Sequence, residues 1–203
     1  MIMAYIFHKL RAAIADFQRE ENGASMQEAV IMFPLIIMAF TAVYSFTDAY
    51  RVKSNTLKAN YAVSDLLSRT GNIIDMNDLY GMESLFRYMT RTADTDTWLR
   101  VTVVFCEEKC DQSDRELGLD WSRSTKPGVA PPYTEGQIRS ALGEAIPVMA
   151  EGERLIIVET LKDWTPSFGK NLTGFGGREF IDTVMTRPRF SKQLCFQGVG
   201  CGA

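Results

Sequence analysis

The longest apolar run of the chain lies near its N-terminus. No charged residue occurs from position 29 to position 47, and most residues of that run are Val, Ile, Leu, Met, Phe or Ala. A helix needs about 20 apolar residues to cross a bilayer core of roughly 30 Å. The pattern therefore predicts a single transmembrane helix. The rest of the chain has no second run of this length and is predicted to fold in water.

Helical periodicity continues beyond the apolar run. Four large side chains recur at helical spacing and project within about 60° of one another on a helix that turns 100° per residue. They are Phe46, Tyr50, Leu57 and Tyr61. The sequence Thr70-Gly71-Asn72 then supplies residues that end helices. One helix is therefore predicted over residues 24–70, comprising the membrane span and its extension.

The residues before this helix form a separate amphipathic pattern. Apolar side chains recur at helical spacing from Phe7 to Phe17, with charged residues on the other side. Residues 1–23 are therefore predicted to form a leader-like segment that lies along a membrane surface. Residues 71–203 are predicted to form one folded domain.

Within residues 71–203, helical and strand patterns alternate. Apolar positions at helical spacing predict a helix around 82–89, with Asn77 or Asp78 as its N-cap, and another at 138–146 that Pro147 ends. Strand patterns occur at 99–105, 155–158 and 180–186. The Asp-, Ser-, Gly- and Pro-rich residues after Cys110, up to Pro131-Pro132, predict an irregular surface loop. Together these elements predict an α+β fold, with antiparallel strands and short helices after a long N-terminal helix.

The overall charge bears on the class of partner. The chain has 22 Lys and Arg against 25 Asp and Glu, a net charge of −3. A protein that binds nucleic acid by electrostatic attraction needs an excess of basic residues. We therefore expect no nucleic-acid partner.

Four cysteines follow the apolar run in two closely spaced pairs, Cys106 with Cys110 and Cys195 with Cys201. An even number at short spacing favours disulfides, which persist outside the reducing cytosol. We expect each close pair to bond, and a cross-link between the two loops stays open if the strands at 99 and 180 are neighbours. A zinc site, whose usual two-residue knuckle spacing differs, and free thiols are the alternatives.

The cysteines also bear on the orientation of the span. Basic residues are balanced on its two sides, so the positive-inside rule does not choose between the orientations. These residues are Lys9, Arg11 and Arg19 before the run and Arg51, Lys53 and Lys58 after it. Disulfides after the run place the C-terminal domain outside the cytoplasm.

A glycine and a glutamate stand just before the apolar run, at Gly23 and Glu28. One interpretation is a capping box formed by Ser25 and Glu28, which satisfies backbone N–H groups at a helix start. The other is a prepilin-like processing site, at which a membrane peptidase cuts between Gly23 and Ala24 and leaves Glu28 as the fifth residue. A glycine allows close approach to the backbone, and a carboxylate at a membrane edge is costly unless it has a partner.

The pattern from Gly23 to Pro34, in which Glu28 is followed by Pro34 inside the apolar run, resembles the N-terminal region of the TadE-like family of tight-adherence (Tad) pilus assembly proteins. Weaker agreements lie elsewhere in the chain. They are Trp121-Ser122, the run 151–159 with Thr165-Pro166 after it, and Arg187-Pro188-Arg189.

The resemblance implies a minor pseudopilin of Tad or Flp pilus biogenesis. Such a protein is anchored in the bacterial inner membrane by one span, with a periplasmic C-terminal domain. Its expected partners are the prepilin peptidase, which would cut at Gly23-Ala24, and other Tad pilus proteins and pilins. Glu28 and Pro34 would serve assembly, Pro34 by bending the helix, although an ordinary transmembrane proline explains it equally well. The resemblance implies no enzymatic activity, no cofactor and no metal.

Two other functions stay open. A signal-anchored envelope protein with a structural or ligand-binding outer domain would retain its N-terminus. An extracytoplasmic enzyme could use Asp94 and Asp96 as acid and base, although both are expected to face solvent. The only histidine, His8, lies before the span, so histidine-dependent triads and metal sites have no histidine in the outer domain.

Overall fold

The computed structural model describes residues 23–93, 95, 97–112, 115–168, 174 and 176–199. Its helices are α2 (Gly23–Arg69), α3 (Met76–Thr90) and α4 (Glu135–Leu142). Its strands are β1 (Thr97–Glu108), β2 (Glu116–Ser124), β3 (Arg154–Trp164) and β4 (Arg178–Thr186). The predicted α+β class is confirmed, because one long apolar helix precedes a four-stranded antiparallel sheet with short helices.

The chain divides into two compact units. One consists of Met1–Phe46 and Ser167–Phe175, and the other of Thr47–Pro166 and Gly176–Ala203. Helix α2 contributes to both, since its 47 residues form one uninterrupted helix that includes Pro34. Its continuation past the apolar run is thus confirmed. We refer to residues 26–46 as the apolar half of α2, and to residues 47–69 as its packed half.

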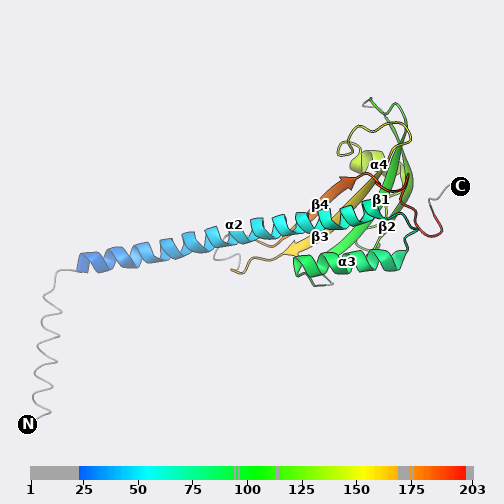
Figure 1. Ribbon diagram of the computed structural model, residues 1–203. Coiled ribbons are helices and arrows are strands. Elements are labelled where there is room, and N and C mark those ends of the chain that lie inside the picture. The colour runs from blue at the N-terminus through cyan, green and yellow to red at the C-terminus, as the bar shows by residue number, and fades with distance from the viewer. Residues whose placement is uncertain are drawn as a thin grey trace, which may run out of the picture. The chain divides into compact units, whose positions relative to one another are not determined.

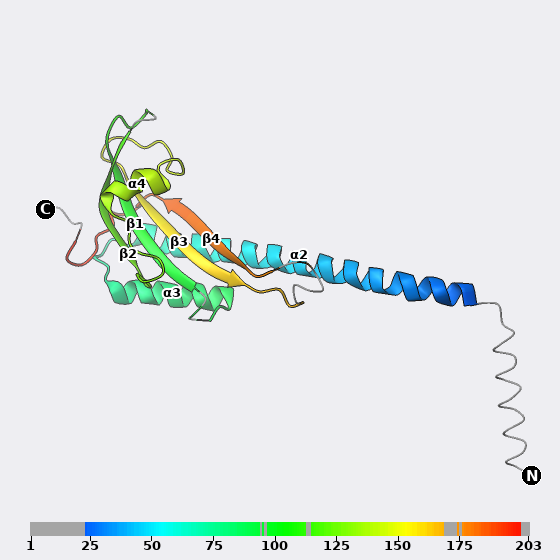
Figure 2. The same cartoon turned by 180° about the vertical axis from the view of Figure 1, so that it is seen from behind.

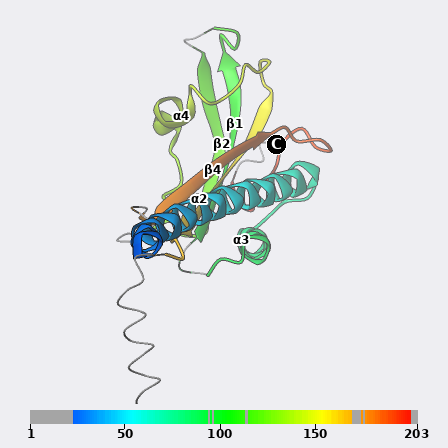
Figure 3. The ribbon, with the colours of Figure 1, turned by 90° about the vertical axis from the view of Figure 1, so that its left-hand side faces the viewer.

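The sheet of the second unit has the strand order β2-β1-β3-β4, and every neighbouring pair is antiparallel. The packed half of α2 and helix α3 cover one face of the sheet, while α4 lies on the other (Figures 1, 2 and 3). A separate apolar core forms on each of these two faces, and a third, smaller cluster consists of Trp98, Ala130 and Leu161. The core on the α2 and α3 side includes Ala59, Val63, Leu67, Leu79, Phe86, Val101, Val103 and Val158. The core on the α4 side includes Val104, Ile138, Leu142, Leu155 and Ile157.

The prediction of an irregular loop before Pro131 is wrong, because β2 occupies much of that segment. Its register explains the error. Leu119 pairs with Val104 and Trp121 with Val103, so Asp120 is an extra residue in a β-bulge. A bulge shifts the alternation of side chains by one residue. Leu119 therefore packs on the α4 side and Trp121 in the opposite core, which hides the simple strand pattern.

Helix α3 begins earlier than predicted. Its N-cap is Asp75, and neither Asn77 nor Asp78 holds that position. The backbone N–H of Asp78 donates to the Asp75 carboxylate at 3.0 Å, and the Asp75 N–H donates to the Asp78 carboxylate at 2.9 Å. This reciprocal capping box satisfies two N–H groups at the helix start. Asp78 thus supports the cap from the third helical position.

Cys106 and Cys110 form a disulfide, as predicted, with their Cα atoms 5.9 Å apart. Their sulfur atoms are therefore not available as zinc thiolates. Cys195 is also disulfide-bonded, and Cys201 lies outside the described residues, so its pairing with Cys195 stays a prediction. The strands at 99 and 180 are not neighbours, because β3 lies between β1 and β4.

Candidate membrane and assembly segment

The apolar half of α2 exposes large hydrophobic side chains over most of its surface, although Thr41 and Ser45 near its C-terminal end are buried. The exposed side chains include Met26, Val30, Ile31, Phe33, Leu35, Ile36, Phe40, Val43 and Phe46. A helix that is apolar over most of its surface suits a lipid environment. At 1.5 Å per residue, residues 26–46 extend over about 30 Å, the thickness of a bilayer core. By length and composition, α2 can therefore cross a membrane once.

The polar groups of this half are few, and the helix itself satisfies one of them. The Thr41 hydroxyl donates to the Met38 carbonyl oxygen at 3.0 Å, so it needs no partner from outside. Pro34 has no N–H and cannot donate to the carbonyl of Val30, one turn earlier. The Val30 carbonyl therefore lacks its usual N–H partner, and this turn is where the helix is most easily bent.

Glu28 is the only charged residue from position 26 to position 46. Its side chain is exposed, and no residue in the described part of the chain forms an ion pair with it. Ser25 and Glu28 both lie inside α2, which begins at Gly23. A capping box needs its Ser at the non-helical N-cap position, so this interpretation of Glu28 does not fit. Gly23 and Ala24 also lie at the start of α2.

The packed half of α2 uses a different face from the predicted stripe. Tyr50 and Tyr61 of that stripe are exposed, whereas Ala59, Val63 and Leu67 enter the core between α2, α3 and the sheet. These buried side chains are smaller than the exposed aromatic ones. Small side chains let the helix approach the sheet closely, and this determines which face is covered.

A row of polar side chains lies beside this apolar contact, at every fourth position of α2. The row consists of Thr56, Asn60, Ser64 and Ser68, all buried. The Asn60 amide donates to the Asp182 carbonyl oxygen of β4 at 2.8 Å. The Ser64 and Thr186 hydroxyls lie 3.0 Å apart. Lys53 also pairs with the buried Asp182 carboxylate. These bonds fix the rotation of the packed half against β4.

Trp121, Ser122, Arg187 and Arg189, which were noted above only for a weak sequence resemblance, hold the sheet domain together. The Trp121 indole N–H donates to the Leu194 carbonyl oxygen at 2.7 Å. The Ser122 hydroxyl oxygen accepts the Tyr133 N–H at 3.0 Å. After β4, the Arg189 N–H donates to the Ser68 carbonyl oxygen at 2.8 Å and so satisfies the end of α2. Arg187 pairs with Glu153 at 2.9 Å.

A buried ion pair on the α4 side of the sheet joins β1 to β3. Arg100 and Glu159 are directly opposed, and the guanidinium donates to both carboxylate oxygens at 2.8 and 2.9 Å. Arg100 also donates to the Pro131 carbonyl and the Tyr133 hydroxyl. Burial and the negative charge of Glu159 raise the pKa of Tyr133. No pattern of neighbouring residues predicts this pair, because the two residues belong to different strands.

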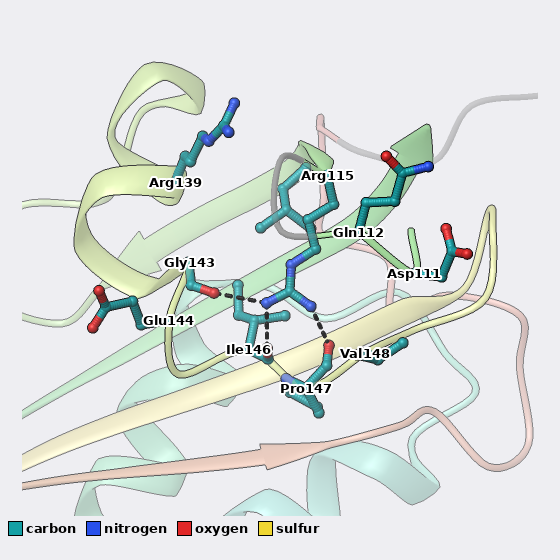
Figure 4. Close-up of a pocket in the computed structure, with 10 residues that line it drawn as sticks. Asp111, Gln112, Arg115, Arg139, Gly143, Glu144, Ile146, Pro147 and Val148 are labelled. Atoms are coloured by element: carbon teal, nitrogen blue, oxygen red, sulfur yellow. Dashed lines mark hydrogen bonds between the residues drawn. The ribbon is translucent and has the colours of Figure 1, made fainter. Parts of the chain in front are cut away.

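A cleft of about 590 Å³ opens beside α4 and is lined by Asp111, Arg115, Arg139, Glu144 and neighbouring residues. Figure 4 shows the Arg115 guanidinium directed at the chain that follows α4. It donates to the carbonyl oxygens of Gly143 at 2.7 Å and Pro147 at 3.0 Å, and to that of Ile146. Arg115 thus stabilises the end of α4, which stops at Leu142, before the predicted end.

The alternative chemistries receive no support from the described residues. Asp94 and Asp96, the residues considered for acid and base catalysis, lie outside them, as does His8. No group of three His, Cys, Asp or Glu side chains in the described part of the chain is arranged to hold a metal ion.

Comparison with protein-family models, curated proteins and solved structures finds no match to this chain.

Proposed function

We propose that this protein is a minor pseudopilin-like component of Tad or Flp pilus biogenesis, anchored in the bacterial inner membrane and acting through protein–protein contacts. One observation carries the proposal. A single helix, α2, has an exposed apolar half that begins at the Gly23–Glu28 pattern and a second half that a small sheet domain covers. The exposed half is available to lipid and to the helices of other subunits.

The position of Glu28 supports an assembly role over a role in helix capping. A carboxylate at the edge of the hydrocarbon costs up to about 3 kcal/mol unless it is paired. Cleavage after Gly23 would create an α-amino group on Ala24, and this positive charge could pair with Glu28 of a neighbouring subunit. The Glu28 side chain is exposed, and no residue in the described part of its own chain forms an ion pair with it. It is therefore available for that contact.

Processing is tested on the protein isolated from its native membrane. We expect a mature chain that begins at Ala24, as determined by N-terminal sequencing and intact mass. Gly23→Leu should accumulate uncleaved, whereas Gly71→Leu, a change in the turn after α2, should be processed normally. A native protein that retains Met1 would contradict the proposal and favour a signal-anchored envelope protein.

Assembly is tested separately with Glu28→Gln and, as its matched control, Gln27→Ala. We expect Glu28→Gln to insert and to be processed, yet to lose pilus assembly and co-purification with other pilins, because its charge no longer compensates the new α-amino group. Gln27→Ala should assemble normally. Normal piliation and partner recovery in the Glu28→Gln strain would rule out the assembly role.

A further inference from the structure

The first residues after β3 and Pro166 contact the apolar half of α2. Ser167 and Phe168 belong to the same compact unit as that half of the helix, although β3 belongs to the sheet domain. The rings of Phe168 and Tyr44 pack edge to face, with centroids 5.4 Å apart and planes at 76°. This geometry is favourable for aromatic pairs. Phe168 is therefore held against the helix at the level of Tyr44.

That level is the water-side end of the apolar run. The last uncharged residue is Thr47, and Asp48 and Arg51 follow it. Three residues of helix separate Tyr44 from Thr47, about 5 Å along the axis. If α2 spans a bilayer, Tyr44 lies where the hydrocarbon meets the headgroups, the zone in which aromatic side chains are enriched.

We propose that Phe168, seated on Tyr44, inserts into the boundary between phospholipid headgroups and acyl chains and so makes a contact with the bilayer in addition to that of α2. The proposal rests on the membrane anchoring inferred above. The surrounding helix surface identifies lipid as the partner, because Phe40 and Val43 expose apolar side chains on the adjoining turn and are continuous with the span. The described neighbours Ser167 and Pro166 are uncharged, so they do not oppose insertion.

The test places an indole at this position in the full-length chain. Phe168→Trp is reconstituted in vesicles of phosphatidylcholine and phosphatidylglycerol, some of which carry brominated acyl chains that quench indole fluorescence. The three native tryptophans, Trp98, Trp121 and Trp164, are only 6%, 2% and 7% exposed, so subtraction of the wild-type signal isolates the new indole. Tyr88→Trp is the matched control, because Tyr88 is an aromatic residue of α3 that is 84% exposed.

We expect the indole of Phe168→Trp to be quenched at least about twofold more by lipid brominated near the headgroups than that of Tyr88→Trp, since an interfacial ring lies about 5–10 Å into the boundary. Acrylamide, which is dissolved in the water, should quench the indole of Tyr88→Trp more than that of Phe168→Trp. Adding Tyr44→Ala to Phe168→Trp should weaken the lipid quenching, because the ring loses its support.

Flotation of the same vesicles distinguishes a failure of the lipid contact from a failure of the membrane anchor. If the protein floats but lipid does not quench Phe168→Trp, the contact is overturned while the membrane anchor stands. Blue-shifted emission without lipid quenching overturns it as well, because the ring is then covered by protein. A chain that does not float overturns the membrane anchor and the lipid contact together.

Discussion

The two halves of α2 belong to the same helix but are suited to different surroundings. The apolar half exposes large hydrophobic side chains over most of its surface, with Glu28 as its single charge. The packed half exposes its aromatic residues and buries small apolar residues beside a row of Ser, Thr and Asn. The apolar side chains of the first half therefore predict that it is suited to apolar surroundings. The large apolar side chains of the second half do not predict which of its faces packs on the sheet.

The difference arises from what each half must match. Lipid requires only that the side chains be apolar, so the order of residues around the helix has little effect. A sheet requires a complementary shape and a partner for each buried polar group. Asn60 meets this demand by donating to the Asp182 carbonyl oxygen, and Ser64 by bonding with Thr186. We expect mutations in the two halves to affect different properties.

The largest effect is expected in the packed half. Leu67 is fully buried and its neighbour Leu66 is 45% exposed, so the two residues form a matched pair. Leu67→Ala should lower the free energy of unfolding of the sheet domain by about 2–5 kcal/mol, because it leaves a cavity in the core. Leu66→Ala should change it by less than about 0.5 kcal/mol. Urea denaturation of the detergent-solubilised chain measures both, and equal losses would show that the assigned contact face is wrong.

A charge in the apolar half should affect insertion alone. Ile36→Arg places a guanidinium near the middle of the apolar run, at a cost to insertion of about 2.5–3.5 kcal/mol. Tyr61→Arg, at an exposed position of the packed half, should insert normally. Alkaline extraction of membranes reports the inserted fraction, and urea denaturation reports the sheet domain. If Ile36→Arg inserted fully, the apolar half would not be a membrane span.

Changes in the polar row should lower the free energy of unfolding by less than Leu67→Ala does. Ser64 and its partner Thr186 should contribute to the same contact. Ser64→Ala and Thr186→Val each remove one side of the hydroxyl contact and should each destabilise the sheet domain by about 0.5–1.5 kcal/mol. The double variant should lose less than the sum of the two, since the contact between the two hydroxyls can be lost only once. The Thr186 hydroxyl also donates to the Ser64 carbonyl oxygen at 3.5 Å, and this bond remains in Ser64→Ala. Strict additivity in the urea unfolding energies would mean that this contact does not orient α2.

Much of the fold could be predicted from sequence, because its signals are local. The apolar run, the 3.6-residue periodicity and the alternation in β1 and β4 each depend on neighbouring residues only. Strand β2 could not be predicted in the same way. The extra residue Asp120 shifts its alternation, so that Leu119 and Trp121 face opposite sides of the sheet. Only the pairing with β1 reveals the strand.

The candidate membrane and assembly segment could also be predicted from the sequence only in part. The composition of the apolar half and the position of Glu28 are evident in the sequence. The contacts that orient the packed half join residues more than a hundred positions apart, as do those of Asn60 with Asp182. The Arg100–Glu159 pair also depends on strand register. Patterns of neighbouring residues carry no information about such pairings.

The smallest expected effect tests whether a local interaction at the start of α3 can be separated from the packing against α2. The Asp78 N–H that donates to the Asp75 carboxylate, with further help from Asn77, lowers the pKa of Asp75 below its ordinary value of 3.8. A lowered pKa means that the charged cap stabilises the fold above about pH 4 and that this contribution is lost as the pH falls through the folded-state pKa. Asp75→Asn keeps an oxygen acceptor at the N-cap but cannot titrate. Wild type and Asp75→Asn should therefore have similar urea midpoints at pH 7, and wild type should lose more stability between pH 4 and pH 2. Equal acid losses in the two proteins would show that the cap contributes nothing of its own and that long-range packing alone fixes the start of α3.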